Sequence, residues 1–387
     1  MAENTITGLV PDIFEALDVV SRELTGLIPA VTISASGDRA ALNQSIVVDV
    51  EPVGNVSNIT PAMTVPDPTG QTSGTTSIVI TKSRAAEFGF NGEDQKGLNT
   101  GPGYLSVRAG KIAQAIRALA NEVETDLAAL QATFSRAYGT AATTPFGTSN
   151  DYTDASNVLK ILKDNGAPVS QNQLVINTSA GANFLGKQSA VNSAGTDSML
   201  RQGVLLDLAG MPIRESAQIN TQTAGAMASA TSTSAAFTVG QTAIPLATAG
   251  TGVVAAGDVI TFANDANKYV VTSVVFAGAN PASGDVITLA APGLRVAQGV
   301  ATRAITVIAT SARNMAFNRS ALVLVARAPA RPEEGDMASD VIIITDPRSG
   351  LSMEFAMYKG YRKVRYEVSL AWGVKNIKPA HTALLLG

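Results

Sequence analysis

The chain has 387 residues, no cysteine, a single histidine and only 15% charged residues. Nucleophilic, acid–base and metal sites draw on histidine, cysteine and clustered carboxylates, so we predict no enzyme activity, no catalytic residues, no cofactor and no metal site. The net charge of −3 argues against a dedicated nucleic-acid binder, and no apolar run approaches the ~18 residues of a membrane span. The low charge suits a surface buried against other subunits.

The N-terminal region has no basic stretch of the kind that opens a signal peptide, so none is expected. Residues 8–28 are predicted to form an amphipathic helix with one apolar stripe. The stripe consists of Ile13, Leu17, Val20, Leu24 and Leu27. This helix would pack on its own domain or serve as an arm on a neighbouring subunit, and the sequence leaves both open.

Residues 40–98 are predicted to contain a long two-stranded arm. The strands are expected at 45–50 and 76–81, which are rich in Val and Ile, and the segment between them is loaded with Pro, Gly, Asn and Thr. A two-stranded hairpin is too thin to have a core of its own. Such an arm must be solvated or lie on a partner.

Residues 103–138 carry the strongest periodic signal and are predicted to form one long helix, which Gly139 ends. Its apolar positions are Ile112, Ile116, Leu119, Val123, Leu127, Leu130 and Phe134. The polar residues expected on the other faces are Gln114, Arg117, Glu122, Glu124 and Gln131. A helix of this length exceeds the globular average and indicates a structural strut.

Residues 150–215 alternate between helical and strand patterns. Helices are predicted at 155–163 and, more weakly, at 182–191, with a short buried strand at 173–177 between them. Residues 210–216 lead into a further strand. The alternation is typical of a mixed α/β region.

Residues 222–308 have a different composition and are predicted to be an all-β insertion of barrel or sandwich type. A low-complexity segment at 221–236, which overlaps its start, is expected to be flexible. Strands are predicted at 235–239, 259–263, 269–276, 286–289 and 304–308. The phrase Gly-Asp-Val-Ile-Thr occurs at 257–261 and at 284–288, where Gly-Asp supplies a turn and Val-Ile-Thr starts a strand.

The C-terminal region resumes the earlier pattern at 315–325 and closes with strands. Residues 341–345 are predicted to be a buried strand, and 353–357 alternate between apolar and polar positions. A two-sided strand follows, with one apolar face. That face consists of Val364, Tyr366, Val368, Leu370 and Trp372, opposite Lys363, Arg365, Glu367 and Ser369.

One segment, 181–187, matches the phosphate-loop spacing G-x-x-x-x-G-K. The next residue should be Ser or Thr but is Gln188. Asp346, after the strand predicted at 341–345, is placed like a metal-holding acid, but Pro347 and Arg348 indicate a turn and the β insertion separates Asp346 from 181–187. The better interpretation is a helix that starts after the capping residues Asn177, Thr178 and Ser179.

Two other groups of residues could suggest a site. The carboxylate pairs Asp49/Glu51, Glu93/Asp94 and Glu333/Glu334 could hydrolyse a glycan, but they lie in turn-rich polar segments typical of solvated charge. Tyr361, Tyr366 and Trp372 could stack on nucleic acid, but Tyr366 and Trp372 share an apolar strand face and are expected in the core.

The order of these parts resembles the major capsid protein (coat protein) family of tailed bacteriophages, in its subfamily with an inserted β-barrel. Residues 77–90 resemble the returning strand of that family's extended loop, 174–180 a strand and helix start of its axial domain, and 366–379 its closing segment. The resemblance covers essentially the whole chain and implies an α+β fold. It implies these parts: N-terminal arm 1–39, extended loop 40–98, spine helix and peripheral domain 99–149, axial domain 150–221 and 310–350, inserted β-barrel-like domain 222–309, and peripheral strands with the C-terminus 351–387.

The resemblance also implies a function, partners and a location. The chain would self-assemble as pentamers and hexamers into an icosahedral shell that encloses phage double-stranded DNA and contacts it non-specifically. A separate scaffolding protein, a portal and a decoration protein are the other partners it implies, with no membrane. The shell would be assembled in the host bacterial cytoplasm and end in the virion. The alternative is a β-rich, phage-associated or secreted protein that binds or hydrolyses carbohydrate.

Overall fold

The structure, a computed structural model, describes residues 26–50, 58–61, 63–64, 74–99, 104–148, 151–187, 207–208, 210–248, 250–275, 282–345 and 351–387. The helix predicted at 8–28 therefore lies almost entirely outside the described residues. Its last positions are described: Leu27 and Ile28 are buried, and a short 3₁₀-helix, η2 (Ile28–Ala30), leads into the first strand.

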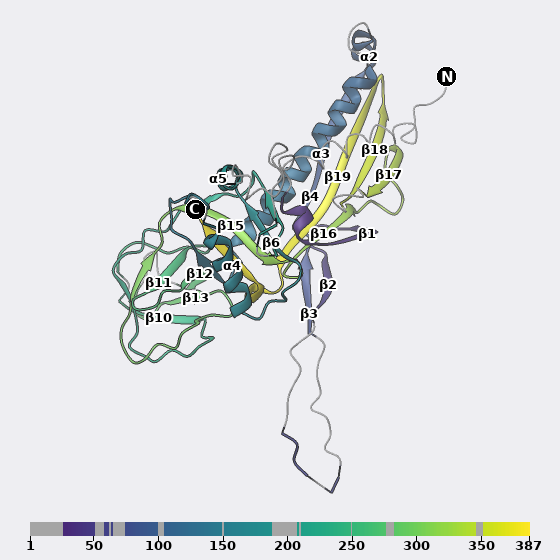
Figure 1. The fold of residues 1–387 in the computed structure, drawn as a ribbon. Helices are drawn as coiled ribbons and strands as arrows, with labels where there is room; N and C mark the ends of the chain where they lie inside the picture. Colours follow the sequence, from purple (N-terminus) through teal and green to yellow (C-terminus); the bar gives the residue numbers. More distant parts are fainter. Residues whose placement is uncertain are drawn as a thin grey trace.

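Six strands form one sheet beside the longest helix (Figure 1). The order is β1-β16-β19-β18-β17, and β4 pairs with the remaining edge of β19. The strands are β1 (Thr32–Ala40), β4 (Lys82–Asn91), β16 (Leu322–Pro329), β17 (Ala338–Thr345), β18 (Ser352–Gly360) and β19 (Lys363–Asn376). The two-sided strand predicted from the sequence is β19. On its predicted apolar face Tyr366, Val368, Leu370 and Trp372 are buried and Val364 is half-buried, whereas Ser369, expected on the opposite face, is buried as well.

The predicted buried strand at 341–345 is an edge strand instead. It belongs to β17, which among the described strands pairs only with β18, and Val341, Ile342 and Ile343 are half-buried. A run of consecutive apolar residues is typical of a strand covered on both faces. Here the same run lies along an edge of the sheet, so the prediction of full burial was wrong.

The long helix, α3 (Tyr104–Ala129), packs its apolar stripe against the six-stranded sheet. It is about 39 Å long at 1.5 Å per residue. The helix ends earlier than predicted: a 3₁₀ turn, η3 (Leu130–Thr133), follows, and β5 (Arg136–Tyr138) takes up the rest of the predicted helical segment. β5 pairs with strands on both sides, so tertiary hydrogen bonding outweighs the helical pattern there. A short helix, α2 (Gly92–Leu98), precedes α3.

A second sheet continues from β5. β5 pairs with β20 (Thr382–Leu386), which is joined in turn by β15 (Ser311–Asn318), β6 (Asn172–Ile176) and β7 (Ile213–Glu215), while β8 (Thr221–Gln222) pairs with the start of β15. Helices α4 (Thr153–Asp164) and α5 (Thr178–Lys187) share a core with this sheet. The helix at 155–163 and the strand at 173–177 are thus confirmed, and α5 begins four residues before the predicted 182. A 3₁₀ turn, η4 (Pro379–His381), leads into β20.

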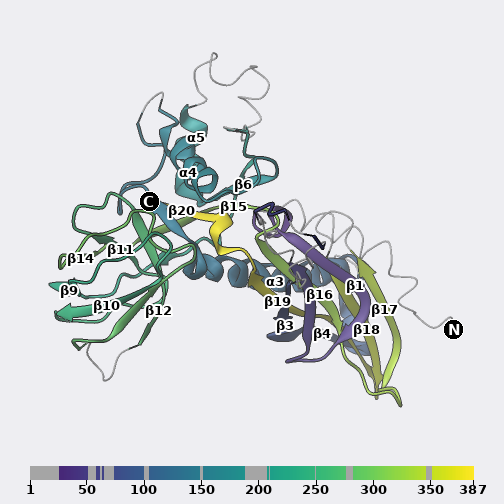
Figure 2. The same ribbon diagram turned by 90° about the horizontal axis from the view of Figure 1, so that it is seen from below.

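The predicted β insertion is a closed barrel. Its strands follow the order β11-β14-β9-β10-β13-β12, and a further pairing of β11 with β12 completes the ring. They are β9 (Ala230–Ser232), β10 (Ala243–Thr248), β11 (Val259–Phe262), β12 (Lys268–Val275), β13 (Val286–Leu289) and β14 (Ala304–Val307). Figure 2 shows the barrel on one side of the molecule and the six-stranded sheet on the other.

The repeated Gly-Asp phrase forms the same turn twice in this barrel. Asp258 accepts a hydrogen bond from the backbone N–H of Ala255, and Asp285 accepts one from Ala282. Gly257 and Gly284 have φ values of +90° and +91°, a region that glycine enters at little cost. The predicted turn-then-strand reading is therefore confirmed at both copies.

Two details of the insertion were predicted wrongly. No strand forms at 235–239, where Phe237 makes only an isolated bridge to Gln298. The segment 221–236, expected to be flexible, contains both β8 and β9. β9 is made of Ala, Thr and Ser, and its residues gain their strand structure from pairing with β10 and β14 rather than from their own propensity.

Candidate functional site

Within the described ranges, no group of three or more His, Asp and Glu side chains is placed to hold a metal ion. No helix in the same part of the chain is long and apolar enough to cross a membrane. His381 lies half-buried in η4, where burial lowers the pKa of its imidazole.

The phosphate-loop spacing at 181–187 lies inside helix α5. The backbone N–H of Gly181 donates to Asn177 O at 2.9 Å, as in any helix, so it is not available to cradle a phosphate. Asn177 caps the helix, because its Oδ1 accepts from the N–H of Ala180 at 2.9 Å. Lys187 lies over the rings of Phe146 and Tyr152. The capped-helix interpretation is confirmed; Asp346 lies outside the described residues.

The carboxylate pairs have surface positions. Glu93 and Asp94 lie in the first turn of α2, where Asp94 and Asn91 form a capping box. Glu333 and Glu334 lie in an exposed turn before β17, and Asp49 is exposed on β2 while Glu51 lies outside the described residues. Of the three aromatic residues, Tyr366 and Trp372 are buried and Tyr361 is exposed.

A two-stranded ribbon projects from the six-stranded sheet (Figure 1). It consists of β2 (Ser45–Val50) and β3 (Gly74–Val79), which pair antiparallel from Ser45–Val79 to Val50–Gly74. The strand predicted at 45–50 is confirmed, and its partner runs two residues earlier than the predicted 76–81. The ribbon thus has the form that the sequence indicated.

The base of the ribbon is fixed to the body. Ile78 is fully buried in a small core with residues of β16 and β19. Lys375 of β19 donates to Thr76 Oγ1 at 2.9 Å and to Ser77 O at 2.8 Å. The backbones of β3 and β19 approach so closely that a Cβ on Gly373 would lie 2.1 Å from Val79 O. Only glycine therefore fits at this position. The body therefore sets the direction in which the ribbon leaves.

The ribbon and the connection between its two strands expose apolar side chains. Val47 on β2 is 63% exposed, and Ile59 and Met63, between the strands, are fully exposed. Nothing in the described part of the chain covers them. A two-stranded ribbon that carries exposed apolar groups is stabilised when another molecule buries them.

A buried carboxylate fixes the point at which the N-terminal segment joins the body. Glu124 of α3 is fully buried and accepts hydrogen bonds from Leu27 N at 2.9 Å, Ile28 N at 2.7 Å and Ser216 Oγ at 2.8 Å. Burial raises the pKa of this carboxyl, while the three donors oppose the rise. One side chain thus links the segment before β1, the long helix and the loop after β7.

A buried arginine joins the barrel to the body. Arg136 of β5 donates to Asn267 Oδ1 beside the barrel strand β12 at 3.0 Å and to Asn165 Oδ1 at the end of α4 at 2.9 Å. The backbones of β5 and β12 are also paired, at Lys268–Ala137 and Tyr269–Arg136. The barrel is therefore a rigid extension of the second sheet.

Replacing Arg136 by methionine is expected to loosen the barrel, because both Asn oxygens lose a donor inside the protein. We expect a loss of about 2–4 kcal/mol of unfolding free energy, measured by urea denaturation. Limited proteolysis should cut faster at the barrel than elsewhere. The exposed Arg84→Met serves as control, and equal stability of the two variants would contradict the role of Arg136.

Sequence reasoning missed these buried charges. Glu124 was assigned to an outer face of the helix, but it is fully buried, and Gln131 beyond it is buried as well. A signal was present: Ala120, Glu124 and Ala128 are spaced by four residues, so small residues flank the glutamate on one helical face. Its partners could not be read from the sequence.

Comparisons with known proteins gave matches among solved structures. No family model and no curated protein matches the chain. A structure from Mycobacterium phage Che8 is 14% identical and covers 89% of this chain and 85% of its own, with a TM-score of 0.40. The capsid structure of cyanophage P-SCSP1u is 11% identical, covers 92% and 86%, and has a TM-score of 0.47. A virus-like particle from Pyrococcus furiosus is 10% identical, covers 97% and 98%, and has a TM-score of 0.42.

Proposed function

We propose that this chain is a major capsid protein of the tailed-bacteriophage type, whose copies assemble into an icosahedral shell around double-stranded DNA. The observation that carries the proposal is the projecting ribbon, whose base is fixed and whose outer part exposes apolar side chains. The solved structures similar to the chain, which include a capsid and a virus-like particle, agree with it.

Each part has a role in the proposal. Residues 1–39 are the N-terminal arm, 40–98 the loop that clasps a neighbour, and 99–149 the peripheral domain with α3 as its spine. Residues 150–221 and 310–350 form the axial domain, 351–387 add peripheral strands, and 222–309 form the inserted barrel. The sheets cross these divisions, since β15 and β20 share one sheet while β16 to β19 share the other.

Assembly is driven by burial at the contacts between subunits. Covering Val47, Ile59 and Met63 is worth about 5–9 kcal/mol per subunit, before the cost of ordering the segment. A shell repeats each contact many times, so a modest gain per subunit is sufficient. Pentamers and hexamers, a scaffolding protein, a portal, a decoration protein and non-specifically held DNA complete the proposed virion, assembled in the host cytoplasm.

The test is to shorten the ribbon without disturbing the body. Residues 51–73 are replaced by an Asn-Gly turn, which joins Val50 to Gly74, two residues that are already paired. We expect circular dichroism and the fluorescence of Trp372 to match the wild type, while electron microscopy shows no closed shells. Both proteins are co-expressed with and without the scaffolding protein.

Point variants test whether the apolar side chains, rather than the length of the ribbon and its connection, are needed for assembly. The triple variant Val47→Ser, Ile59→Ser and Met63→Ser should lower the yield of particles at least tenfold. Its control replaces three exposed valines outside the ribbon by serine: Val169, Val239 and Val300. Normal shells from the shortened ribbon would refute the clasp. A wild-type chain that stays a monodisperse monomer at high concentration would refute the capsid proposal and favour the carbohydrate-binding alternative.

A further inference from the structure

The turn between β18 and β19 presents an aromatic ring and two cations at the end of the six-stranded sheet. Gly360 and Lys363 pair across it, and Tyr361 and Arg362 form its two-residue tip. The Tyr361 side chain is 90% exposed. Arg362 has a φ of +57°, where glycine or asparagine would be less strained, and its carbonyl is held by the N–H of Gly92. The fold therefore fixes an arginine where its backbone conformation is disfavoured.

A second turn, before β17, presents the opposite charge. It is closed by a hydrogen bond from Gly335 N to Pro332 O at 3.1 Å, and it carries Glu333 and Glu334 at its exposed tip. Met337, directly after it, is 85% exposed.

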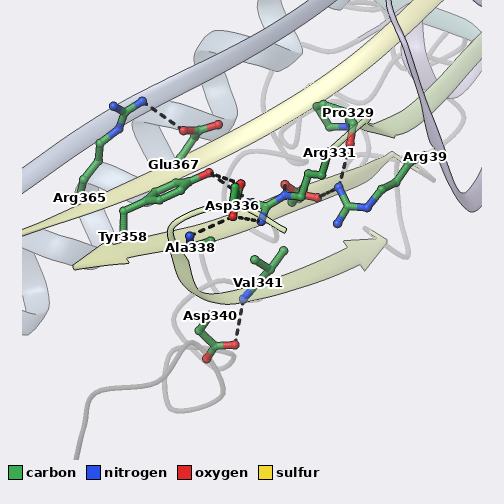
Figure 3. Close-up of polar contacts among 11 residues, drawn as sticks. Arg39, Pro329, Arg331, Asp336, Ala338, Asp340, Val341, Tyr358, Arg365 and Glu367 are labelled. Atoms are coloured by element: carbon green, nitrogen blue, oxygen red, sulfur yellow. Dashed lines mark hydrogen bonds and ion pairs between the residues drawn. The ribbon is translucent and has the colours of Figure 1, made fainter. Parts of the chain in front are cut away.

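The acidic turn has a rigid base. Asp336 accepts from Arg331 Nη1 at 3.0 Å, from the N–H of Ala338 at 2.9 Å and from the hydroxyl of Tyr358 at 3.3 Å (Figure 3). Arg331 is itself held by Glu354 at 2.8 Å. The acidic turn therefore keeps one position relative to the sheet.

The two turns belong to one surface. Ala338, just after the acidic turn, pairs with Tyr358, just before the basic one. A hollow between the turns is lined by Met337, Tyr358, Gly360 and Lys363 among others. This surface thus holds an aromatic residue with cations at one end and a thioether with carboxylates at the other.

The charges at the tips of the two turns take part in no ion pair with the part of the subunit that the structure describes. Other charges on this sheet are paired, such as Arg365 with Glu87 and Glu367, and Arg331 with Glu354. Within the described residues no ion pair reaches the four tip charges. These four are Arg362, Lys363, Glu333 and Glu334. Charge that is not used within the fold is available for a contact between molecules.

The geometry points to a contact between two copies of this chain, in which the basic turn of one copy docks on the acidic turn of the next. Tyr361 would then lie on Met337, and Arg362 and Lys363 would face Glu333 and Glu334. Tyr, Arg and Met are the residue types enriched at protein interfaces, and sulfur packs favourably on aromatic rings. Each subunit carries both halves, so successive copies can join head-to-tail, and such a contact closes into a ring where the rotation between copies allows it. A nucleic-acid partner is disfavoured because the acidic turn beside the cations would repel phosphate. The inference rests on the proposed self-assembly.

Charge reversal followed by mixing tests this contact. One variant carries Arg362→Glu and Lys363→Glu, and the other carries Glu333→Lys and Glu334→Lys. Each alone should form at least tenfold fewer particles than the wild type by sedimentation and electron microscopy. An equimolar mixture should assemble again, because each copy's reversed turn now meets its opposite on the other copy. A chain with all four changes should also assemble.

The control is Lys160→Glu with Lys163→Glu, two exposed cations on α4. Circular dichroism and Trp372 fluorescence verify that every variant is folded. The inference is overturned if the reversed variants assemble like the wild type, or if neither the mixture nor the fourfold variant recovers. It is also overturned if only the basic-turn variant has an effect and that effect is loss of co-purified DNA. If the wild type itself forms no particles, the proposed function fails with it.

Discussion

Replacing Glu124 by leucine is expected to lower the free energy of unfolding by about 3–5 kcal/mol. Leucine has nearly the same shape but offers no acceptor, so the N–H groups of Leu27 and Ile28 lose their hydrogen bonds in a fully buried site. Each buried donor left unpaired costs about 1–3 kcal/mol. Urea denaturation followed by the fluorescence of Trp372, the only tryptophan, gives the measurement.

A glutamine variant tests the charge on the same side chain. Glutamine keeps an oxygen for the two N–H groups, and its amide can donate to the hydroxyl of Ser216. Burial raises the pKa of Glu124 above its ordinary value of 4.5 in the folded state. Between the unfolded and folded pKa values the folded protein therefore holds a proton that the unfolded chain has released, and stability falls as the pH rises through that window.

The Glu124→Gln variant lacks this titration. The stability of the wild type relative to the variant should therefore be highest below pH 4.5 and decline as the pH rises through the folded pKa. Unfolding curves for both proteins at a series of pH values measure the difference. A relative stability that rises with pH would show that hydrogen bonding to the carboxylate outweighs its burial. Glu122→Gln, at a partly exposed position of the same helix, is the matched control.

The fold could be predicted where local pattern and tertiary position agree. The sequence of strand β19 alternates from Lys363 to Leu370, and the strand lies at the centre of its sheet, so the pattern placed the buried side chains of Tyr366, Val368 and Leu370 correctly. It did not predict that Ser369 on the other face is buried too. Strand β9 has no such pattern, because its Ala, Thr and Ser residues are held by neighbours distant in the sequence. The predicted end of α3 was wrong for the same reason, because the strands that pair with β5 lie more than a hundred residues downstream.

The candidate interaction sites were likewise predictable only where the local sequence determines them. The ribbon was predictable because its composition rules out a core of its own. The link through Glu124 was not, since its backbone partner Leu27 lies 97 residues away in the sequence. From the sequence, Lys363 and Arg365 were expected only on the polar face of a two-sided strand, and no basic turn was predicted. Its significance depends on the positive φ of Arg362 and on the acidic turn beside it, which only the fold brings together.

Trp372→Ala is expected to cost about 3–5 kcal/mol of unfolding free energy, the range for removing a fully buried aromatic ring. The ring lies where α3 packs on β19, and its Nε1 donates to Asp126 Oδ2 at 2.8 Å. Lys82 binds the other oxygen of Asp126 at 2.8 Å and lies over the indole ring. Truncation would therefore remove both the packing and one end of a short polar network.

Trp372→Phe should cost less, about 1–2 kcal/mol, because phenylalanine fills most of the space and Asp126 keeps its bond to Lys82. Circular dichroism replaces fluorescence as the probe, and Tyr361→Ala, at an exposed aromatic of the same sheet, is the control with an expected loss under about 0.5 kcal/mol. A loss for Trp372→Ala no larger than the control would refute the role of the ring. The backbone oxygen of Trp372 also accepts from Thr81 N at 3.0 Å, just after the ribbon. That backbone bond survives the substitution, but the indole ring also lies against Lys82, three residues after the ribbon, and bonds Asp126 of the helix. Trp372→Ala should therefore reduce particle formation more than its loss of stability alone predicts, while Trp372→Phe retains assembly.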